Sequence, residues 1–270
     1  MLNVYGYNRK TAEEDKAILE AVKRHHNRVI AEGFTVIMTV LVGSQNYDLD
    51  HEDSDIDTYS FILPSFKEMA LGVGAAPAGI LNEPDGHCNY KDIREALNLL
   101  LKASPNSVEY FTSKYKIYNP KYKEILAPYL EDSPLYAMVH CNYKHMLYAM
   151  AGMARQLTVR NMSAGKRFGH ALRLESMYYH FLNSYNASSV LDIRPGGDRD
   201  LALWAKTHDP TPEEEESYHL RCKEVEEFLT EKAENFYLTD EQKEYEEYGR
   251  KLIEEMRHRI FKFYLMEIVK

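Results

Sequence analysis

The chain has 270 residues, of which 44% are hydrophobic and 28% charged, a composition ordinary for a globular protein of one or two domains. Its 33 Lys and Arg against 42 Asp and Glu give a net charge of −9, which argues against a large nonspecific nucleic-acid surface. No apolar run approaches the ~20 residues of a membrane span, the first residues show no signal-peptide pattern, and the three cysteines are far apart. These features predict a reduced, cytoplasmic protein with no membrane partner.

The first predicted element is a helix over residues 11–33. Thr11 and Glu14 have the spacing of a capping box, and apolar residues then recur at helical spacing up to Gly33. His25 and His26 fall on this helix, where adjacent histidines are expected at the surface and not as ligands.

Residues 36–63 carry the most informative pattern of the chain. An apolar run over 36–42 stops at Gly43-Ser44, a segment dense in acids follows, and a second apolar run from Tyr59 to Leu63 ends at Pro64. The pattern predicts a buried strand, a turn with a short helix, and a second strand that begins with Asp55 and Asp57.

The spacing of Asp55 and Asp57 suggests a cation site. Side chains alternate along a strand, so these two carboxylates share a face with Cα atoms roughly 6.5–7 Å apart. Such a pair repels unless a cation lies between its members, and Mg²⁺ prefers a few carboxylates together with substrate phosphates. Gly43-Ser44 precedes a predicted helix start, where backbone N–H groups attract phosphate. A phosphate site beside a metal site indicates nucleotide chemistry.

Three other interpretations of the acidic segment stay open. A Ca²⁺ loop starting at Asp48 would need Gly at the position of Asp53 and Glu at that of Tyr59. A solvated acidic loop would leave the Gly-Ser turn unexplained. A catalytically inactive protein that kept the scaffold would show the same motif.

Gly43-Ser44, ten intervening residues and Asp55-Ile56-Asp57 at the head of a strand resemble the DNA polymerase β-like nucleotidyltransferase superfamily. The longer string GSQNYDLDHEDSDID is similar to a bacterial and phage branch of it that is linked to RNA repair. The resemblance implies metal-dependent transfer of a nucleoside monophosphate, with two Mg²⁺ ions and a third carboxylate on a neighbouring strand.

The chain after Pro64 predicts a short helix over 64–71, a loop over 72–86, a third strand over 87–91 and a helix over 92–101. Asp92 is the expected third carboxylate, because YKDIR resembles a KDIR string of the branch; Asp85 and Glu83 are its rivals. Asn89 departs from the acidic strand that the branch implies, and Asp92 has a structural alternative as the N-cap of the following helix. Further on, Glu109 is expected in a short helix behind the sheet, buried and paired with a cation.

From Ser133 the pattern is helical, with helices over 136–157 and 164–182. No acid occurs between Asp132 and Glu175, which suggests a segment that faces an anion. Lys166, His170 and Arg173 share one helical face, a donor set that suits a triphosphate, and the H-A-L-R string again resembles the branch. The alternative is a solvated cationic face.

The remaining pattern predicts a short helix over 200–206 and two long acidic helices over 211–236 and 239–268, which pack on each other or form a partner surface. The predicted fold class is α+β. A small mixed β-sheet with helices on one side forms a catalytic domain over 1–130, an α-helical bundle covers 131–270, and the active cleft lies between them.

The functional hypothesis is a nucleotidyltransferase that moves NMP from an NTP such as ATP to an acceptor hydroxyl and releases pyrophosphate. Asp55, Asp57 and Asp92 would hold two Mg²⁺ ions and act catalytically, and the nucleotide would bind Gly43, Ser44, Lys166, His170 and Arg173. An RNA 3′ end, tRNA-like or broken, is the first choice of acceptor; a protein side chain or an antibiotic hydroxyl is the alternative. A nucleotide-binding regulator without turnover and a helix-mediated interaction protein are the other classes.

Overall fold

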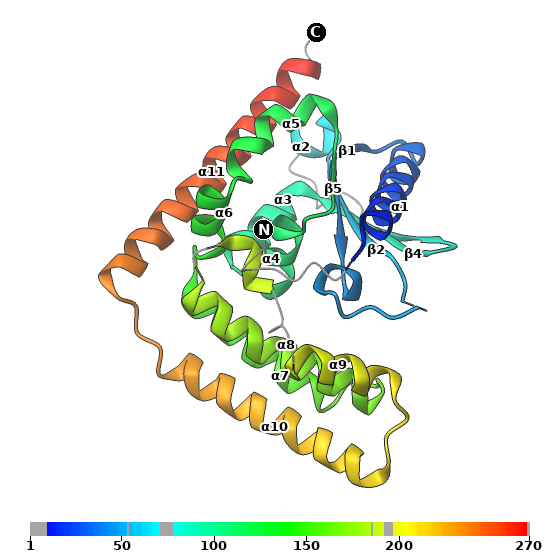
Figure 1. Ribbon diagram of the computed structural model, residues 1–270. Helices are drawn as coiled ribbons and strands as arrows, with labels where there is room; N and C mark the ends of the chain where they lie inside the picture. Colours follow the sequence, from blue (N-terminus) through cyan, green and yellow to red (C-terminus); the bar gives the residue numbers. More distant parts are fainter. Residues whose placement is uncertain (1–9, 53, 71–77, 185, 192–196, 269–270) are drawn as a thin grey trace.

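The computed structural model describes residues 10–52, 54–70, 78–184, 186–191 and 197–268, which form a small sheet surrounded by helices (Figure 1). The strands are β1 (Thr35–Val42), β2 (Asp57–Leu63), β3 (Gly79–Glu83), β4 (Gly86–Asp92) and β5 (Lys116–Tyr118). The α-helices are α1 (Ala12–Ala31), α2 (Phe66–Ala70), α3 (Ile93–Leu101), α4 (Pro105–Thr112), α5 (Pro120–Leu126), α6 (Asp132–Val139), α7 (Tyr143–Leu157), α8 (Ala164–Asn183), α9 (Gly197–Thr207), α10 (Pro212–Glu234) and α11 (Asp240–Ile268). Short 3₁₀ turns cover Ser44–Tyr47, Ala127–Tyr129 and Ala187–Leu191.

The sheet is mixed, in the order β3-β4-β2-β1-β5. Strand β2 pairs antiparallel with β1 and parallel with β4, and the other pairs are antiparallel. Six of the eight residues of β1 are buried, because helices cover both faces of this central strand. The α+β prediction is confirmed. The sequence pattern did not reveal β3 and β5, and residues 72–77 of the predicted loop lie outside the described part.

The expectation of helices on one side of the sheet is wrong. On one face, Val22 and Val29 of α1 pack in clusters with Leu41, Val36 and Ile62. On the opposite face, the side chains of Met38, Val40 and Phe61 join a large core with α3, α4 and the later helices. Two covered faces explain why β1 reads as a nearly continuous apolar run instead of an alternating one.

The two adjacent histidines of α1 are buried, contrary to the surface position expected for them. His25 is fully buried with Nδ1 2.9 Å from the Thr58 hydroxyl, and His26 Nδ1 lies 2.9 Å from that of Thr39. Burial lowers the pKa of His26. Both imidazoles therefore satisfy polar groups between α1 and the sheet. The Thr11–Glu14 capping box is present as predicted.

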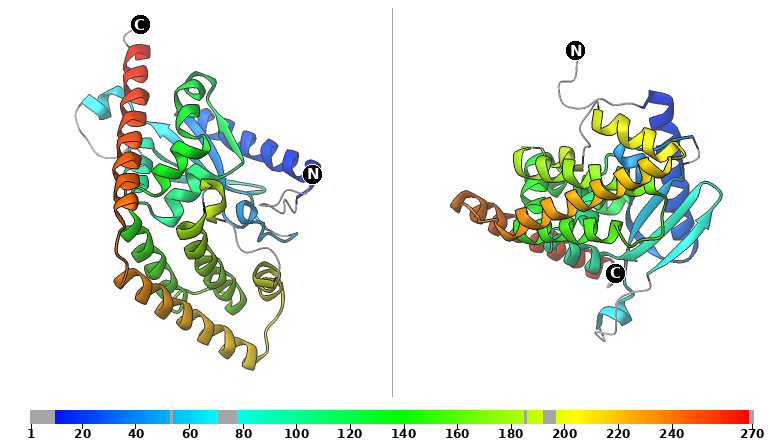
Figure 2. Two further views of the ribbon diagram at one scale, coloured as in Figure 1. Left: turned by 60° about the vertical axis from the view of Figure 1, so that its left-hand side comes forward. Right: turned by 90° about the horizontal axis from the view of Figure 1, so that it is seen from below.

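The helical part packs directly against the sheet face opposite α1 (Figure 2). Helix α10 runs along α7 and α8, and α11 runs along α6, α3 and α5. The long acidic helices therefore pack on other helices, and the prediction that they pack on each other is not supported. The predicted helix over 136–157 is interrupted at His140–Asn142, where buried His140 places Nε2 2.8 Å from the Phe181 carbonyl.

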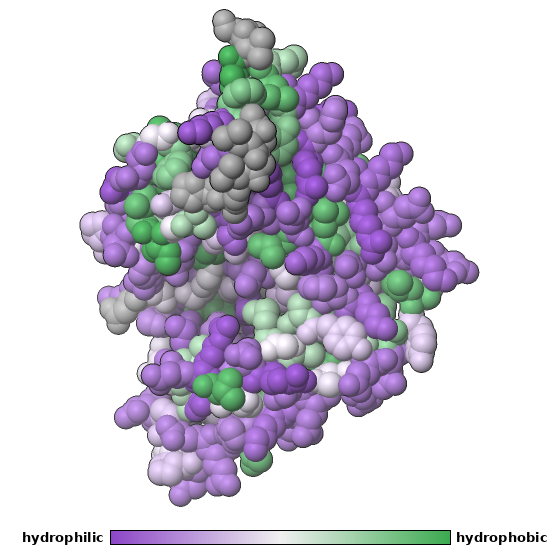
Figure 3. All heavy atoms as spheres, turned by 180° about the vertical axis from the view of Figure 1, so that it is seen from behind, coloured by the Kyte–Doolittle hydropathy of each residue, from purple (hydrophilic) through white to green (hydrophobic). Residues whose placement is uncertain are grey.

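The surface seen from behind is mostly hydrophilic, with hydrophobic side chains in small separate groups (Figure 3). Within the described residues, no helix combines the length and the apolar character needed to cross a membrane.

Candidate active site

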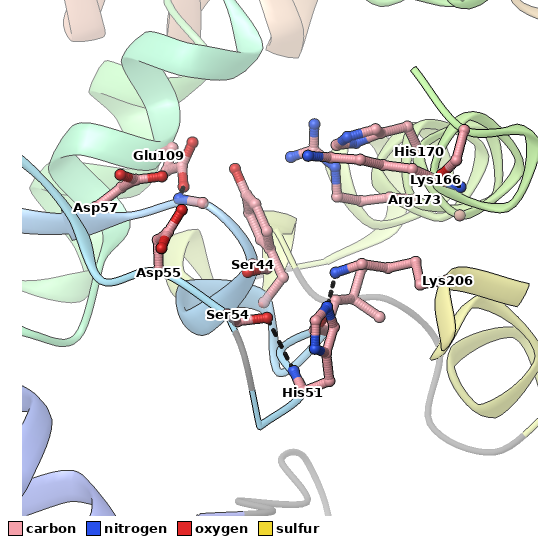
Figure 4. Close-up of a pocket in the computed structure, with 15 residues that line it drawn as sticks. Ser44, His51, Ser54, Asp55, Asp57, Glu109, Lys166, His170, Arg173 and Lys206 are labelled. Atoms are coloured by element: carbon pink, nitrogen blue, oxygen red, sulfur yellow. Dashed lines mark hydrogen bonds between the residues drawn. The ribbon is translucent and has the colours of Figure 1, made fainter. Parts of the chain in front are cut away.

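A cavity of about 500 Å³ lies where β1 ends and β2 begins, between these strand ends and the helices α8 and α9 (Figure 4). Seven of the eight residues predicted to act in catalysis or nucleotide binding line this cavity, all except Asp92. The lining residues include Gly43, Ser44, Tyr47, Leu49, His51, Ser54, Asp55, Asp57, Glu109, Lys166, His170, Arg173 and Lys206. Acidic side chains stand on the sheet side, and the labelled side chains of α8 face them from across the cavity (Figure 4).

The turn after β1 depends on glycine at position 43. Gly43 has φ = 80°, a left-handed conformation that L side chains rarely adopt, and a Cβ there would lie 3.7 Å from Asp57 Oδ2. Its N–H donates to Glu109 Oε1 at 2.6 Å. This N–H is therefore engaged within the protein. Gly43 shapes the turn and lets Ser44 line the cavity, whereas a direct contact between its N–H and phosphate would require Glu109 to move.

Glu109 is a buried carboxylate that anchors this turn from α4. Glu109 is 6% exposed, and burial raises the pKa of its carboxyl group. Arg173, the Tyr47 hydroxyl and the Gly43 N–H act in the opposite direction without cancelling this shift. The guanidinium carbon of Arg173 lies 4.3 Å from the centre of the Tyr47 ring. The predicted burial of Glu109 beside a cation is confirmed, and this cation is one of the expected nucleotide-binding residues.

Asp55 and Asp57 line the same cavity, as predicted, but β2 begins at Asp57, so the expectation that Asp55 starts the strand is wrong. Asp55 is exposed, and its carboxylate makes no hydrogen bond or ion pair with any residue in the described ranges. Asp57 begins β2, and its Oδ1 lies 3.0 Å from Nδ1 of His87 and accepts from the backbone N–H of His87 at 3.3 Å. The strand beside Asp57 therefore presents a histidine where the resemblance implies a carboxylate.

The donor set fits a hard cation that shares its ligands with a substrate. Among the described residues, no group of three or more His, Cys, Asp or Glu side chains is arranged to hold a metal ion. Two carboxylates on one face, one of them solvent-exposed, match the way Mg²⁺ is held by one or two carboxylates plus substrate phosphates and water. Glu109, the third carboxylate of the cavity, is already engaged by Gly43 and Arg173.

The structure does not bring Asp92 to the site. Asp92 pairs with Ile62 in the parallel β2–β4 register, five residues from Asp57, which corresponds to about 16 Å along the strand. Asp92 is fully buried and caps α3, accepting from the Arg94 backbone N–H at 2.8 Å and from Arg94 Nε at 2.7 Å. The alternative interpretation as an N-cap is confirmed, and the expectation that Asp92 is a metal ligand at this site is corrected.

The two rivals of Asp92 face α1 instead of the cavity. Asp85 Oδ2 accepts from Arg24 at 2.5 Å and its Oδ1 lies 3.1 Å from His25 Nε2, while Glu83 pairs with Arg28 at 3.1 Å. Two acids of the loop that would begin a Ca²⁺ site also lie beside a cation, because Lys10 Nζ donates to Asp50 at 2.6 Å and lies 3.9 Å from Asp48 Oδ1. Asp53 lies outside the described residues.

The cationic side of the cavity comes from α8 and α9. Lys166, His170 and Arg173 lie together on it as their spacing predicted, and Lys206 of α9 joins them. Arg173 is 6% exposed, and its Nε has no hydrogen-bond partner among the described residues. Burial and the neighbouring charge of Lys166 lower the pKa of Lys206. Cations held this close repel one another, so the arrangement favours a bound polyanion.

His170 is neutral within this group of cations. Burial, followed by the charges of Arg173, Lys166 and Lys206, lowers the pKa of its imidazole to about 3. It therefore acts near pH 7 as a neutral hydrogen-bonding ring and not as a positive charge.

Sequence reasoning missed several residues of the cavity. Lys206 was included in a short predicted helix, but nothing in its spacing connects it with Lys166; its Nζ donates to the Leu49 carbonyl and so ties α9 to the acidic loop. The Ser54 hydroxyl accepts from the His51 backbone N–H at 2.9 Å and shapes the same loop just before Asp55. The run of polar residues between Gly43 and Asp57 was the only sequence signal for these loop contacts.

Comparison with known protein families supports the resemblance. The family model described as RlaP, the RNA repair pathway DNA polymerase beta family, matches residues 14–187, well over half of the chain. The chain belongs to this family. The match to the RNA repair pathway DNA polymerase beta family includes Gly43, the Asp55-Ile56-Asp57 motif and the α8 residues, so the superfamily and its link to RNA repair are confirmed. Among curated proteins, none matches the chain significantly.

Proposed function

We propose that the protein is a metal-dependent nucleotidyltransferase that moves NMP from an NTP to the hydroxyl group at an RNA 3′ end. One observation carries the proposal. The carboxylates of Asp55 and Asp57 face a cationic wall across a single cavity; this wall consists of Lys166, Arg173 and Lys206. Within it, the buried Arg173 has an Nε without a partner among the described residues. A triphosphate that bridges the two sides would satisfy both.

The triphosphate is proposed to lie along α8. Arg173 offers a planar donor group and Lys166 a mobile point charge, the two kinds of cation that recognise phosphate. Lys206 adds charge from α9, and the Ser44 hydroxyl and the neutral His170 ring supply directional hydrogen bonds. These groups neutralise the negative charge that increases on pyrophosphate as it leaves.

Asp55 and Asp57 are proposed to hold Mg²⁺ with the nucleotide. When bound, the ion polarises phosphate oxygens and offsets their charge. A second ion, which the resemblance implies, would take its ligands from Asp57 and from the substrates. The two aspartates also keep the nucleotide phosphates close to Asp57, where a second, neighbouring cavity lets an acceptor approach.

The direct test is nucleotide transfer by Asp55→Asn and Asp57→Asn. Each variant keeps the side-chain size and removes a charge that would bind the cation, worth several kcal/mol, so we expect a loss of at least about 100-fold in transfer of label from NTP to cellular RNA. Asp240→Asn, at the exposed first residue of α11, is the matched control and should retain full activity. Circular dichroism verifies that the variants are folded.

The same experiment decides between acceptors. The wild-type protein is incubated with each labelled NTP, cellular RNA and cellular protein, and each pool is then counted. Label in RNA supports the proposal. Label in protein alone would replace the RNA acceptor by a protein one, and full activity of Asp57→Asn would refute the assignment of the site.

A further inference from the structure

A second cavity, of about 490 Å³, lies beside the first on the same face of the sheet. The two cavities share Gly43, Asp57 and Glu109. The second one, which we name the strand groove, is lined in addition by Val42, Tyr59, Ile80, His87, Asn89, Asn106 and Tyr110. Its strand residues all come from one sheet face, because Tyr59 and Ile80 are both in register with Asn89.

The chemistry of the strand groove differs from that of the nucleotide cavity. Of the described residues that line it, none is Lys or Arg. Its two acids are the shared ones, and both are engaged, Asp57 by His87 and Glu109 by Gly43. Apart from His87, which contacts Asp57, the remaining side chains carry no charge near pH 7: two amides, two tyrosines, a valine and an isoleucine. A triphosphate therefore has no reason to enter this groove, and a polycationic ligand finds no free carboxylate deep inside it.

A transfer reaction requires two substrates that meet at the reacting phosphorus. In this molecule the cationic cavity and the neutral groove meet at Asp57. We infer that the strand groove binds the acceptor, and that the acceptor is the terminal nucleoside of an RNA 3′ end, with its ribose hydroxyl directed at Asp57. The inference rests on the proposed function and adds the place and the recognition chemistry of the second substrate.

The aromatic and apolar side chains suit an unstacked base. The half-buried Tyr59 ring lies 4.5 Å from the ring of Tyr110, which is 9% exposed, and Ile80 is 63% exposed on the edge strand β3. Such side chains bind the flat faces of single-stranded bases without requiring a particular sequence. Lys91 Nζ lies 5.7 Å from the centre of the Tyr59 ring, so a cation stands close to the groove, where the 5′ phosphate that joins the terminal nucleoside to the rest of the strand would need one.

The amide side chains suit the polar edge of the same nucleoside. Asn89 uses its NH₂ group for a 3.3 Å contact with the Thr58 carbonyl, which fixes the plane of the amide. Asn106 is exposed in the first turn of α4 and presents both a donor and an acceptor to the groove. A base edge or a ribose hydroxyl can bond to these groups, and the open mouth near Ile80 and Asn106 leaves room for the rest of the strand.

The transfer step assigned to this arrangement is balanced. The acceptor hydroxyl oxygen forms a bond to the α-phosphorus of the NTP, and the bond from that phosphorus to the β-phosphate bridging oxygen breaks. Pyrophosphate leaves on the side of α8, and the hydroxyl proton is released to water.

The test measures the two substrates separately. Asn106→Ala and Ile80→Glu are compared with Asn27→Ala, an exposed asparagine of α1 on the other side of the sheet. A fluorescein-labelled oligoribonucleotide with a free 3′ hydroxyl and a fluorescent non-hydrolysable NTP serve as probes. Loss of a hydrogen bond from Asn106 should weaken RNA binding about 5- to 10-fold, and the new charge in Ile80→Glu should weaken it at least as much. The Kd of the NTP probe should stay within twofold of wild type, and Asn27→Ala should leave both Kd values unchanged.

The outcomes separate this inference from the proposed function. RNA binding that is insensitive to both groove variants, or that the wild-type protein lacks, overturns the groove assignment even if transfer occurs. Loss of NTP and RNA binding together in the groove variants also overturns it, because that pattern indicates a general structural effect. If the groove variants weaken RNA binding but no label is transferred from any NTP, the groove assignment holds and the proposed function is wrong. Labelling of protein in place of RNA overturns the RNA acceptor.

Discussion

Arg173 shows how one side chain can serve both the fold and a ligand. It offsets the buried charge of Glu109, stacks on Tyr47, and still has an Nε without a partner among the described residues. A buried guanidinium with a spare donor carries a desolvation cost that a bound phosphate removes. The same surroundings account for the behaviour of His170, which lies one helical turn earlier on α8.

The lowered pKa of His170 predicts a specific dependence of stability on pH. Between about pH 6.5 and pH 3, residue 170 is protonated in the unfolded chain but stays neutral in the folded protein. The free energy of unfolding therefore decreases as the pH falls, by up to about 1.4 kcal/mol per pH unit. Urea denaturation should therefore show that the free energy of unfolding falls between pH 7 and pH 5.5 by about 1 kcal/mol more in the wild type than in His170→Gln.

The other buried histidines do not disturb this comparison. His26 and His140 also have lowered pKa values because of burial, but they are present in both proteins and cancel in the difference. Equal losses in the wild type and in His170→Gln would show that the imidazole is protonated in the folded state near pH 5.5, and would contradict the environment described for it.

Among the elements, the close crossing of α8 and α9 brings the cations together. A Cβ at Gly165 would stand 1.6 Å from the Ala205 carbonyl oxygen, and one at Gly169 would stand 3.4 Å from that of Ala202. Only glycine at position 165 allows the helices to approach this closely, and the approach places Lys206 beside Lys166. The close contact between α8 and α9 is therefore needed to bring Lys206 next to the cations of α8.

Gly165→Ala should therefore damage both stability and nucleotide binding. The backbone must shift to admit the methyl group, which typically costs about 1–3 kcal/mol, and the shift moves Lys206 away from the cavity. We expect a lower midpoint in urea and an NTP Kd raised several-fold. Gly152→Ala on α7 is the matched control, because a Cβ there meets nothing within 4 Å; as a helix-interior glycine it should gain about 0.5–1 kcal/mol. Similar effects of both substitutions would contradict the assigned contact.

Local periodicity predicted those features that depend on neighbouring residues in the chain. The common cavity of Asp55 and Asp57, the shared helix face of Lys166 and Arg173, and the capping box at Thr11 each involve residues two to seven positions apart. The position of Asp92 depends instead on the parallel register of β4 against β2, which no local pattern encodes. The same register brings His87 to Asp57.

Short and interrupted elements escaped prediction for a related reason. Strand β5 has only three residues, which pair with the middle of β1, so its existence depends on a distant partner. The break between α6 and α7 occurs where His140 bonds to the Phe181 carbonyl of α8, although the methionine stripe continues through it. Tertiary contacts decided both cases, and propensity did not.

At the scale of the whole molecule, sheet and helices share one core but supply opposite charges to the cavity. The largest cluster of buried side chains extends from Ile37 and Phe61 of the sheet to Met146 and Ile260 of the helical part. The family match ends at residue 187, before α9, α10 and α11, so Lys206 and the outer helices lie beyond the matched segment. A nucleotide that spans the cavity would add contacts between the two sides.

Bound nucleotide should consequently stabilise the whole fold. A non-hydrolysable NTP with Mg²⁺ at 100 times its Kd adds about 2.7 kcal/mol, which for a chain of this size corresponds to a rise in Tm of roughly 5–10 °C. Lys166→Ala removes an exposed charge that faces the phosphates; a tenfold weaker Kd at the same nucleotide concentration reduces the rise by about 1.4 kcal/mol, or roughly 3–6 °C. Differential scanning fluorimetry measures both values.

Lys144→Ala is the control for this effect. Lys144 belongs to the same acid-free segment, but it lies on α7 with Nζ 6.0 Å from the centre of the Tyr148 ring, and it is not among the residues of the cavity. If the cationic wall binds the nucleotide, Lys144→Ala keeps the full rise in Tm while Lys166→Ala loses part of it. Equal losses in both variants would mean that net positive charge, and not the position of Lys166 on α8, attracts the nucleotide, and the proposed site would then be wrong.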